Sequence, residues 1–203
     1  MKTVRTRVGL SEISSFAKYR VTGEGAAGWL DRLLACKLPK PGRMTLAPML
    51  KEDGRLIGDF SLANLGSRNS NGEDWFLAGS GIAEQYHMRW FEAHLPQDGS
   101  VRIEALGAKL TGLSIAGPKA RDVLARVTRA DVSNAAFPFM ATAKMDVGMA
   151  PCLVGRVSYT GDLGYEIWVA PEYQRAAYQT FDGGGRRIRH RPVRLTRAQR
   201  ASA

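Results

Sequence analysis

Short stretches with strand character recur along most of this chain, and turn-forming residues separate them. They are rich in β-branched, aromatic and aliphatic residues, as strands are. They cover Met44 to Leu50, Leu56 to Leu65, Trp75 to Ala78, Val101 to Leu106, Leu110 to Ile115, Pro151 to Tyr159 and Tyr165 to Ala170. Turns at Glu52 to Gly54, Ser67 to Gly72 and Gly161 to Gly164 join neighbouring stretches and favour hairpins.

Apolar residues at helical spacing occur four times between these stretches. The expected inward faces are Ala26, Trp29, Leu30, Leu33 and Leu34; Ile82, Tyr86, Trp90, Phe91 and Leu95; Ala120, Val123, Leu124 and Val127 after Pro118; and Tyr173, Ala177 and Phe181 after Pro171. Strands and helices mix irregularly, which favours an α+β fold, with mainly antiparallel sheets and packed helices, over a regular βαβ winding.

The bulk composition is that of an ordinary globular protein. Of 203 residues, 44% are hydrophobic and 24% are charged, and no apolar run is long enough for a secretory signal or a membrane span. A cytoplasmic protein without a membrane partner is therefore expected. Cys36 and Cys152 have no close cysteine or histidine partner, so neither a disulfide framework nor a zinc site is expected.

Positive charge is concentrated at the end of the sequence. Residues 183–203 contain seven arginines and no acidic residue, and they supply seven of the ten net positive charges. This segment has no sustained apolar face, so we expect residues 1–182 to form the folded region and 183–203 a basic, disordered tail. Two intertwined subdomains, with about 50–110 as an insertion, remain an alternative arrangement of the folded region.

Common cofactor motifs are weak or missing. Gly23 to Gly28 fits the pattern G-x-G-x-x-G, but Glu24 would repel a phosphate and no βαβ unit follows, so the glycines are expected to start a helix. His87, His94 and His190 lack the spacing to carboxylates that metal sites use, and no metal site is predicted.

Two carboxylates lie inside strand-like stretches beside apolar residues. Because successive side chains of a strand point to opposite faces, Asp59 is expected to share a face with Ile57 and Ser61, and Glu166 with Trp168. An isolated carboxylate on a strand is usually a solvated surface group, so the spacing alone does not select either residue for function.

Four segments resemble signature stretches of the aminomethyltransferase superfamily, to which the glycine-cleavage T-protein belongs. They are FAKYRVTG (16–23), PMLKEDGRLIGDFSL (48–62), SIAGPKA (114–120) and RVSYTGDLGYEIW (156–168). The resemblance runs from about Val8 to Phe181. Residues 54–60 are closer to the folate-binding C-terminal region of dimethylglycine and sarcosine dehydrogenases than to the glycine-cleavage enzyme.

This resemblance implies a tetrahydrofolate-binding domain linked to one-carbon transfer that gives 5,10-methylenetetrahydrofolate. Asp59 matches the family's catalytic aspartate, expected near the reacting folate nitrogens to stabilise developing positive charge. Glu166 matches the glutamate that binds the pterin, and Tyr159 matches a tyrosine of the same pocket. Arg156 is expected to be a structural partner rather than a ligand contact.

The sequence departs from the family's pattern after Phe181. The family continues past the position of Phe181 into a helix with a folate-binding arginine, so a truncated domain of doubtful activity is expected. Suitable codons for Gly185 to Ala203, read one nucleotide out of phase, give ADGFGIGPFGSRALNALRL, which resembles the missing segment. The tail is therefore expected to be a frameshift product, a hypothesis that the gene sequence tests.

The wider resemblance also bears on partners and alternatives. In the dehydrogenases a flavin-binding domain precedes this region, so no FAD site is assigned to this chain, and a separate flavin-dependent dehydrogenase subunit is a candidate partner. One alternative is a non-catalytic family relic or adaptor. Another is a nonspecific nucleic-acid binder through the arginine-rich tail, an interpretation that depends on charge alone.

Overall fold

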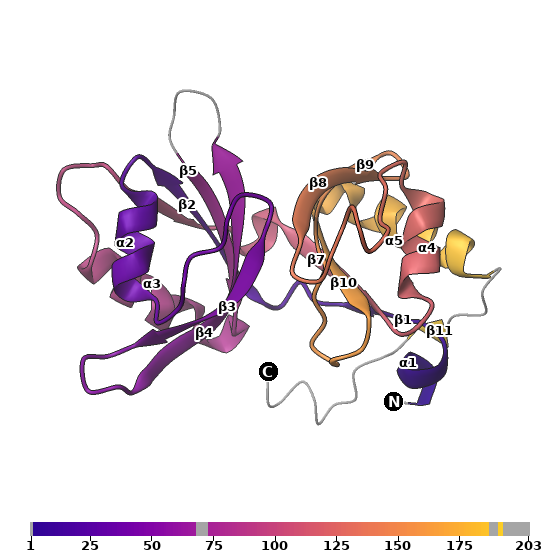
Figure 1. Cartoon of the computed structure of the whole chain (residues 1–203), viewed down its shortest axis with the longest axis horizontal. Helices are drawn as coiled ribbons and strands as arrows, with labels where there is room; N and C mark the ends of the chain where they lie inside the picture. Colours follow the sequence, from indigo (N-terminus) through magenta and orange to yellow (C-terminus); the bar gives the residue numbers. More distant parts are fainter. Residues whose placement is uncertain (1, 68–72, 187–190, 193–203) are drawn as a thin grey trace. The chain divides into compact units, whose positions relative to one another are not determined.

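The computed structural model describes residues 2–67, 73–186 and 191–192, and these residues form two compact units (Figure 1). The middle unit is Ser15–Gly107. The terminal unit combines the described residues before Ser15 with those from Ala108 onward. The tail expected from residue 183 begins inside a helix that ends at Arg186, and apart from Arg191 and Pro192 its remaining residues lie outside the described part.

The middle unit contains a five-stranded antiparallel sheet in the order β3-β4-β5-β2-β6. Its elements are β2 (Ala17–Gly23), α2 (Ala26–Leu33), β3 (Met44–Leu50), β4 (Leu56–Ser67), β5 (Glu73–Gly79), η2 (Gly81–Ala83), α3 (Glu84–Ala93) and β6 (Arg102–Ala105). Helices α2 and α3 cover one face of this sheet (Figure 1). The buried rings of Tyr19, Trp29, Phe60 and Phe91 pack between the helices and the sheet.

Helix α3 exists where it was predicted, but its inward face is different. Phe91 is buried as expected, whereas Ile82 is 80% exposed and Tyr86 is also exposed. His87 takes the inward position one turn before Phe91, and its Nδ1 lies 3.0 Å from the hydroxyl oxygen of Tyr19. The prediction was wrong because a histidine with a buried hydrogen-bond partner can occupy a core position that hydropathy gives to an apolar residue.

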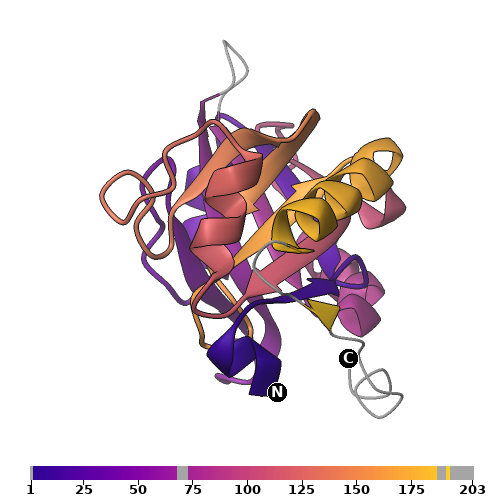
Figure 2. The ribbon, with the colours of Figure 1, turned by 90° about the vertical axis from the view of Figure 1, so that its right-hand side faces the viewer.

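The terminal unit contains a six-stranded sheet in the order β11-β1-β7-β10-β9-β8, antiparallel except for the β1–β11 pair. Its elements are α1 (Lys2–Thr6), β1 (Gly9–Glu12), η3 (Gly107–Lys109, which begins at the unit boundary), β7 (Thr111–Ala116), α4 (Ala120–Val127), β8 (Thr142–Val147), β9 (Ala150–Gly155), β10 (Gly164–Val169), α5 (Pro171–Arg186) and β11 (Arg191–Pro192). Helices α4 and α5 lie side by side over one face of the sheet (Figure 2).

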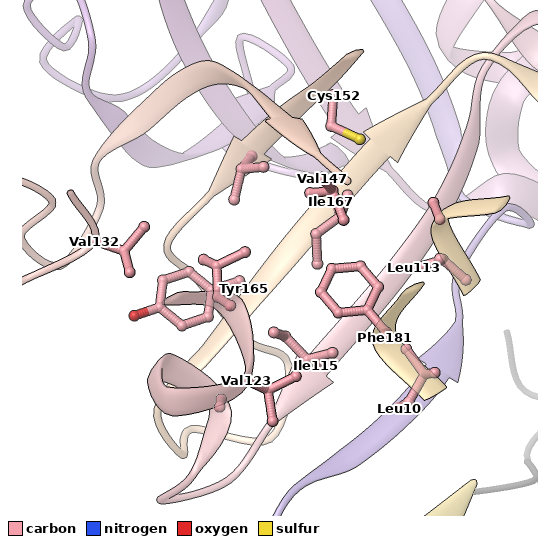
Figure 3. Packing of buried hydrophobic residues seen from close by; sticks show 14 of the residues in the cluster. Leu10, Leu113, Ile115, Val123, Val132, Val147, Cys152, Tyr165, Ile167 and Phe181 are labelled. Atoms are coloured by element: carbon pink, nitrogen blue, oxygen red, sulfur yellow. The ribbon is translucent and has the colours of Figure 1, made fainter. Parts of the chain in front are cut away.

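The core of the terminal unit fills the space between these two helices and the sheet. Side chains of β7, β10 and both helices meet there, including Ile115, Val123, Tyr165, Ile167 and Phe181 (Figure 3). The predicted inward residues of α2 and α4 are confirmed, with Val127 packed at the edge of the core. Tyr173 of α5 is instead exposed, and the inward face of that helix begins at Ala177.

The α+β architecture with two antiparallel sheets and packed helices is therefore confirmed. Strands β1 and β8 were not predicted, and the strand predicted to reach Tyr159 ends at Gly155. Among the described residues, no helix is both long and apolar enough to cross a bilayer.

Candidate functional site

Asp59 lies in β4 of the middle unit, opposite Pro48 of β3. Its side chain is exposed, whereas Phe60 and Leu62 point into the core beneath α2 and α3. Ser61 alternates with Phe60 and Leu62 in a regular part of the strand, so it shares the face of Asp59, as predicted. Asp59 is thus on the sheet face that these two helices leave uncovered.

Ile57 does not share the face of Asp59, which corrects the sequence-based expectation. The β3–β4 register shifts between Met49 and Leu50, so that Leu56 and Gly58 pair with consecutive residues of β3 and Ile57 is the extra residue. Ile57 is 5% exposed and packs in the core. A β-bulge therefore interrupts the alternation directly before Asp59, and bulges often change the direction of a functional side chain.

His87 lies behind this bulge. Burial lowers the pKa of His87 below its ordinary value of 6.5, and a hydrogen bond with the backbone of Ile57 opposes that shift. A Cβ on Gly58 would lie 2.7 Å from Nε2 of His87, so only glycine fits at that position. The buried imidazole therefore fixes the strand next to Asp59, a role that sequence spacing could not reveal.

Glu166 lies in the middle of β10 in the terminal unit. Tyr165, Ile167 and Val169 point into the core, so Glu166 and Trp168 share the opposite face, which confirms the predicted alternation. Glu166 pairs with Ser114 of β7 on one side and with Gly155 of β9 on the other. On the β9 side, the neighbour of Glu166 is therefore a glycine, which has no side chain to contact the carboxylate.

Burial raises the pKa of Glu166 from 4.5 to about 7. The side chain is partly buried, and no described residue donates a hydrogen bond to its carboxylate or forms an ion pair with it. An isolated buried carboxylate is costly, and strongly shifted pKa values are concentrated at functional sites. The hydrogen-bonding capacity of the Glu166 carboxyl is therefore unused among the described residues.

Tyr159 lies in the loop between β9 and β10, where its side chain is 94% exposed. The loop is shaped by Gly161, whose φ of 74° favours glycine, and by the hydroxyl of Ser158, which donates to the carbonyl oxygen of Asp162 over 2.5 Å. The packing of Tyr159 in a ligand pocket stays a prediction.

The same loop borders a cavity of about 270 Å³ that sequence reasoning missed. Its lining includes the polar residues Arg156, Ser158 and Asp162 and the apolar residues Phe139, Val157 and Leu163. Arg156 donates from Nη1 to the carbonyl oxygen of Phe137 over 2.8 Å, so it does have a structural partner. Phe139 is separated from the loop in sequence, and no spacing rule would have joined them.

The described residues contain no group of three side chains suited to a metal ion. Asp59 belongs to the middle unit, whereas Tyr159 and Glu166 belong to the terminal unit. That all three contact one folate molecule stays a prediction from the resemblance.

Comparison with known proteins identifies the family. The model of the GCVT N-terminal domain matches residues 1–199. Human mitochondrial dimethylglycine dehydrogenase is 34% identical over 185 residues, which are 91% of this chain and 21% of that enzyme. The chain thus spans about a fifth of this relative.

Two solved structures share the fold. The glycine cleavage system aminomethyltransferase T from Bartonella henselae has a TM-score of 0.77 at 23% identity, covering 95% of this chain and 49% of that protein. A chain of the heterotetrameric sarcosine oxidase from Corynebacterium sp. U-96 has a TM-score of 0.68 at 17% identity, covering 97% of this chain and 93% of that chain. The chain described above therefore belongs to the aminomethyltransferase family, as a GCVT N-terminal domain.

Proposed function

We propose that this chain is a tetrahydrofolate-binding domain of the aminomethyltransferase and dimethylglycine/sarcosine dehydrogenase type. Its membership of the GCVT N-terminal domain family supports this function, as do the activities named for its relatives. Bound tetrahydrofolate would supply the nitrogen atoms that accept a one-carbon unit and become 5,10-methylenetetrahydrofolate.

The observation that carries the proposal is the state of Glu166. A pterin ring presents adjacent N–H groups, and a carboxylate can accept two parallel hydrogen bonds from such an edge. Glu166 receives no hydrogen bond from the described residues, and its pKa of about 7 reflects burial without compensation. A ligand with two adjacent N–H donors would supply the hydrogen bonds that the described residues do not make to the Glu166 carboxylate.

The other two proposed contacts differ in exposure from Glu166. Asp59, on the uncovered face of its sheet, would stabilise positive charge that develops near the folate nitrogens. Tyr159, with its exposed ring, would gain its packing from the bound ligand. Both contacts depend on the motif match, whereas the proposal for Glu166 also depends on its environment.

Isothermal titration calorimetry with tetrahydrofolate tests the site. We expect Glu166→Gln and Asp59→Ala each to weaken binding by at least about tenfold, the usual cost of losing a charge-assisted hydrogen bond. Glu172→Gln, which changes an exposed carboxylate at the start of α5, is the matched control and should bind like wild type. Equal affinities for all four proteins would exclude the proposed contacts.

The rate of methylenetetrahydrofolate formation from formaldehyde separates an enzyme from a binding domain. If the chain accelerates this condensation, Asp59→Ala should reduce the rate while leaving the fold intact. A folded chain that binds tetrahydrofolate without any acceleration would favour the adaptor function instead.

We further propose that a separate flavin-dependent dehydrogenase subunit is the partner. The sarcosine oxidase chain with the same fold belongs to a heterotetramer, and this chain covers nearly all of it. Co-expression with a flavin dehydrogenase encoded next to this gene should give one complex in size-exclusion chromatography. Separate elution of the two proteins at micromolar concentration would contradict the partnership.

A further inference from the structure

One row of paired residues crosses the sheet of the terminal unit through Glu166. Its members, in strand order, are Thr142 of β8, Gly155 of β9, Glu166 of β10, Ser114 of β7 and Ser11 of β1. Directly paired residues of antiparallel strands have their side chains on the same face. All five lie outside the core cluster, so the row carries four polar side chains and one glycine on the face opposite the core.

Thr142 is buried in this row without a hydrogen-bond partner. The residue is 5% exposed, and its hydroxyl oxygen has no partner among the described residues. Buried polar groups nearly always have a partner, because an unsatisfied one costs free energy. A valine of nearly the same shape would avoid that cost. The described residues therefore leave a hydroxyl as well as a carboxylate unsatisfied in one row.

Only a glycine separates Thr142 from Glu166. Neighbouring strands lie about 4.8 Å apart, so the backbones of Thr142 and Glu166, with β9 between them, are roughly 10 Å apart. Gly155 contributes no side chain to the space between them. The large ring on the same face of β10, Trp168, lies over β7, where a Cβ on Gly112 would be 2.5 Å from its Cζ3 atom. The two unsatisfied groups therefore flank a position without a side chain.

The chemistry of a pterin ring fits a carboxylate and a hydroxyl in one row. The N–H pair of the ring lies beside an acceptor, the ring carbonyl oxygen, in the same plane. An ionised carboxylate can only accept hydrogen bonds, so it can bind the N–H pair but not the carbonyl oxygen. A threonine hydroxyl can donate to that oxygen. A pterin that binds Glu166 through its N–H pair therefore needs a donor of this kind beside the carboxylate.

We propose that Thr142 is a second polar contact of the pterin ring, which positions the ring over Gly155 and against Glu166. This inference rests on the proposed function, because it assumes that tetrahydrofolate binds at Glu166. It goes beyond the motif match, which assigns only Asp59, Tyr159 and Glu166 to the ligand. Thr142 would orient the ring and would take no part in the one-carbon chemistry.

Calorimetric titration of the full chain with tetrahydrofolate and with 6-methyltetrahydropterin, which has the ring without the folate tail, tests this contact. Thr142→Val removes the hydroxyl and should weaken the binding of both ligands about three- to tenfold, the usual cost of one neutral hydrogen bond. Thr142→Ser keeps the hydroxyl and should bind both ligands like wild type. Equal affinities of wild type and Thr142→Val for both ligands would overturn the proposal.

A second buried threonine of the same sheet is the matched control. Thr111 of β7 donates from its hydroxyl to the carbonyl oxygen of Val169 over 3.0 Å. Thr111→Val should therefore lower the urea midpoint of the ligand-free chain and leave tetrahydrofolate affinity unchanged. Thr142→Val should leave that midpoint unchanged or raise it, because it breaks no hydrogen bond among the described residues. A midpoint lowered as much as in Thr111→Val would show that the Thr142 hydroxyl has a structural partner, and would overturn the proposal.

The same titrations separate a failure of this contact from a failure of the folate site. No tetrahydrofolate binding by wild type would overturn both the proposed function and the role of Thr142. Binding that is weakened in Glu166→Gln but unchanged in Thr142→Val would overturn only the role of Thr142. Weaker binding of tetrahydrofolate to Thr142→Val with unchanged binding of 6-methyltetrahydropterin would place the hydroxyl at the folate tail, and would likewise overturn the assignment to the ring.

Discussion

The two units share one architecture, but their candidate carboxylates lie in different electrostatic environments. Each has a mainly antiparallel sheet with two helices on one face and a candidate carboxylate on the other. In the middle unit Asp59 is exposed, and the perturbed group is the buried His87 behind it. In the terminal unit the perturbed group is the candidate carboxylate itself, Glu166. The comparison teaches that motif position alone does not determine the chemistry of a carboxylate.

The pH dependence of stability should therefore have opposite signs in the two units. His87 has a lowered pKa, so its contribution favours folding above 6.5 and is lost as the pH falls. Glu166 has a raised pKa, so its neutral form favours folding below 4.5, and that advantage is lost as the pH rises to about 7.

The largest expected effect is on the core of the middle unit. Phe91 contacts Tyr19, Trp29 and Phe60, and Phe91→Ala should cost about 3–5 kcal/mol of unfolding free energy, since it leaves a cavity among aromatic rings. Urea denaturation measures the loss. Ile82→Ala, at an 80% exposed position just before α3, should cost less than about 0.5 kcal/mol. Similar losses for both would contradict the inward face assigned to α3.

Glu166→Gln should stabilise the terminal unit at alkaline pH. At pH 8 the wild-type carboxylate is ionised against its raised pKa, and the neutral amide avoids that cost, by roughly 2 kcal/mol. Below pH 4.5 the difference should vanish, because the wild-type carboxyl is protonated in both states. Urea denaturation at pH 4 and pH 8 measures both values. An equal effect at the two pH values would show that burial does not perturb Glu166.

Acidification should act on the middle unit in the opposite direction. Lowering the pH from 7.5 to 5.5 should lower the unfolding free energy of the middle unit, because the unfolded state binds a proton that the buried imidazole of His87 resists. The midpoint of the His87 ring resonance by NMR should lie below 6.5. A midpoint above 6.5 would mean that the hydrogen bonds to Tyr19 and Ile57 favour the imidazolium, and would reverse the predicted sign.

The sequence predicted buried positions correctly where an apolar residue lies in the core and a polar residue lies at the surface. The apolar stripes of α2 and α4 are continuous, so spacing identified the buried Trp29 and Leu124. It failed on α3, where hydropathy excludes His87 from the core and includes Ile82. Strand β8 was missed because only its alternate residues Ala143, Met145 and Val147 are apolar, and the polar residues between them face water on an edge strand.

The candidate site depended on a different kind of information. The alternation that places Glu166 on the strand face opposite the core could be predicted, but neither its raised pKa nor its lack of a partner among the described residues could be. The bulge at Ile57 depends on strand pairing with β3, which no local pattern specifies. The cavity at Arg156 joins Phe139 to a loop conformation set by Gly161 and Gly164, and such long-range geometry appears only in the folded chain.

The smallest expected effect is a gain in stability that is confined to the middle unit. Gly28 lies inside α2, and a Cβ added there would meet nothing within 4 Å, so Gly28→Ala should stabilise that unit by about 0.5–1 kcal/mol through helix propensity. Native-state hydrogen exchange should show slower exchange in β2 and β5, which pack with α2, and unchanged rates in β7 and β10. Equal slowing in all four strands would mean that both units open together, and the opposite pH dependences would then merge into one global transition.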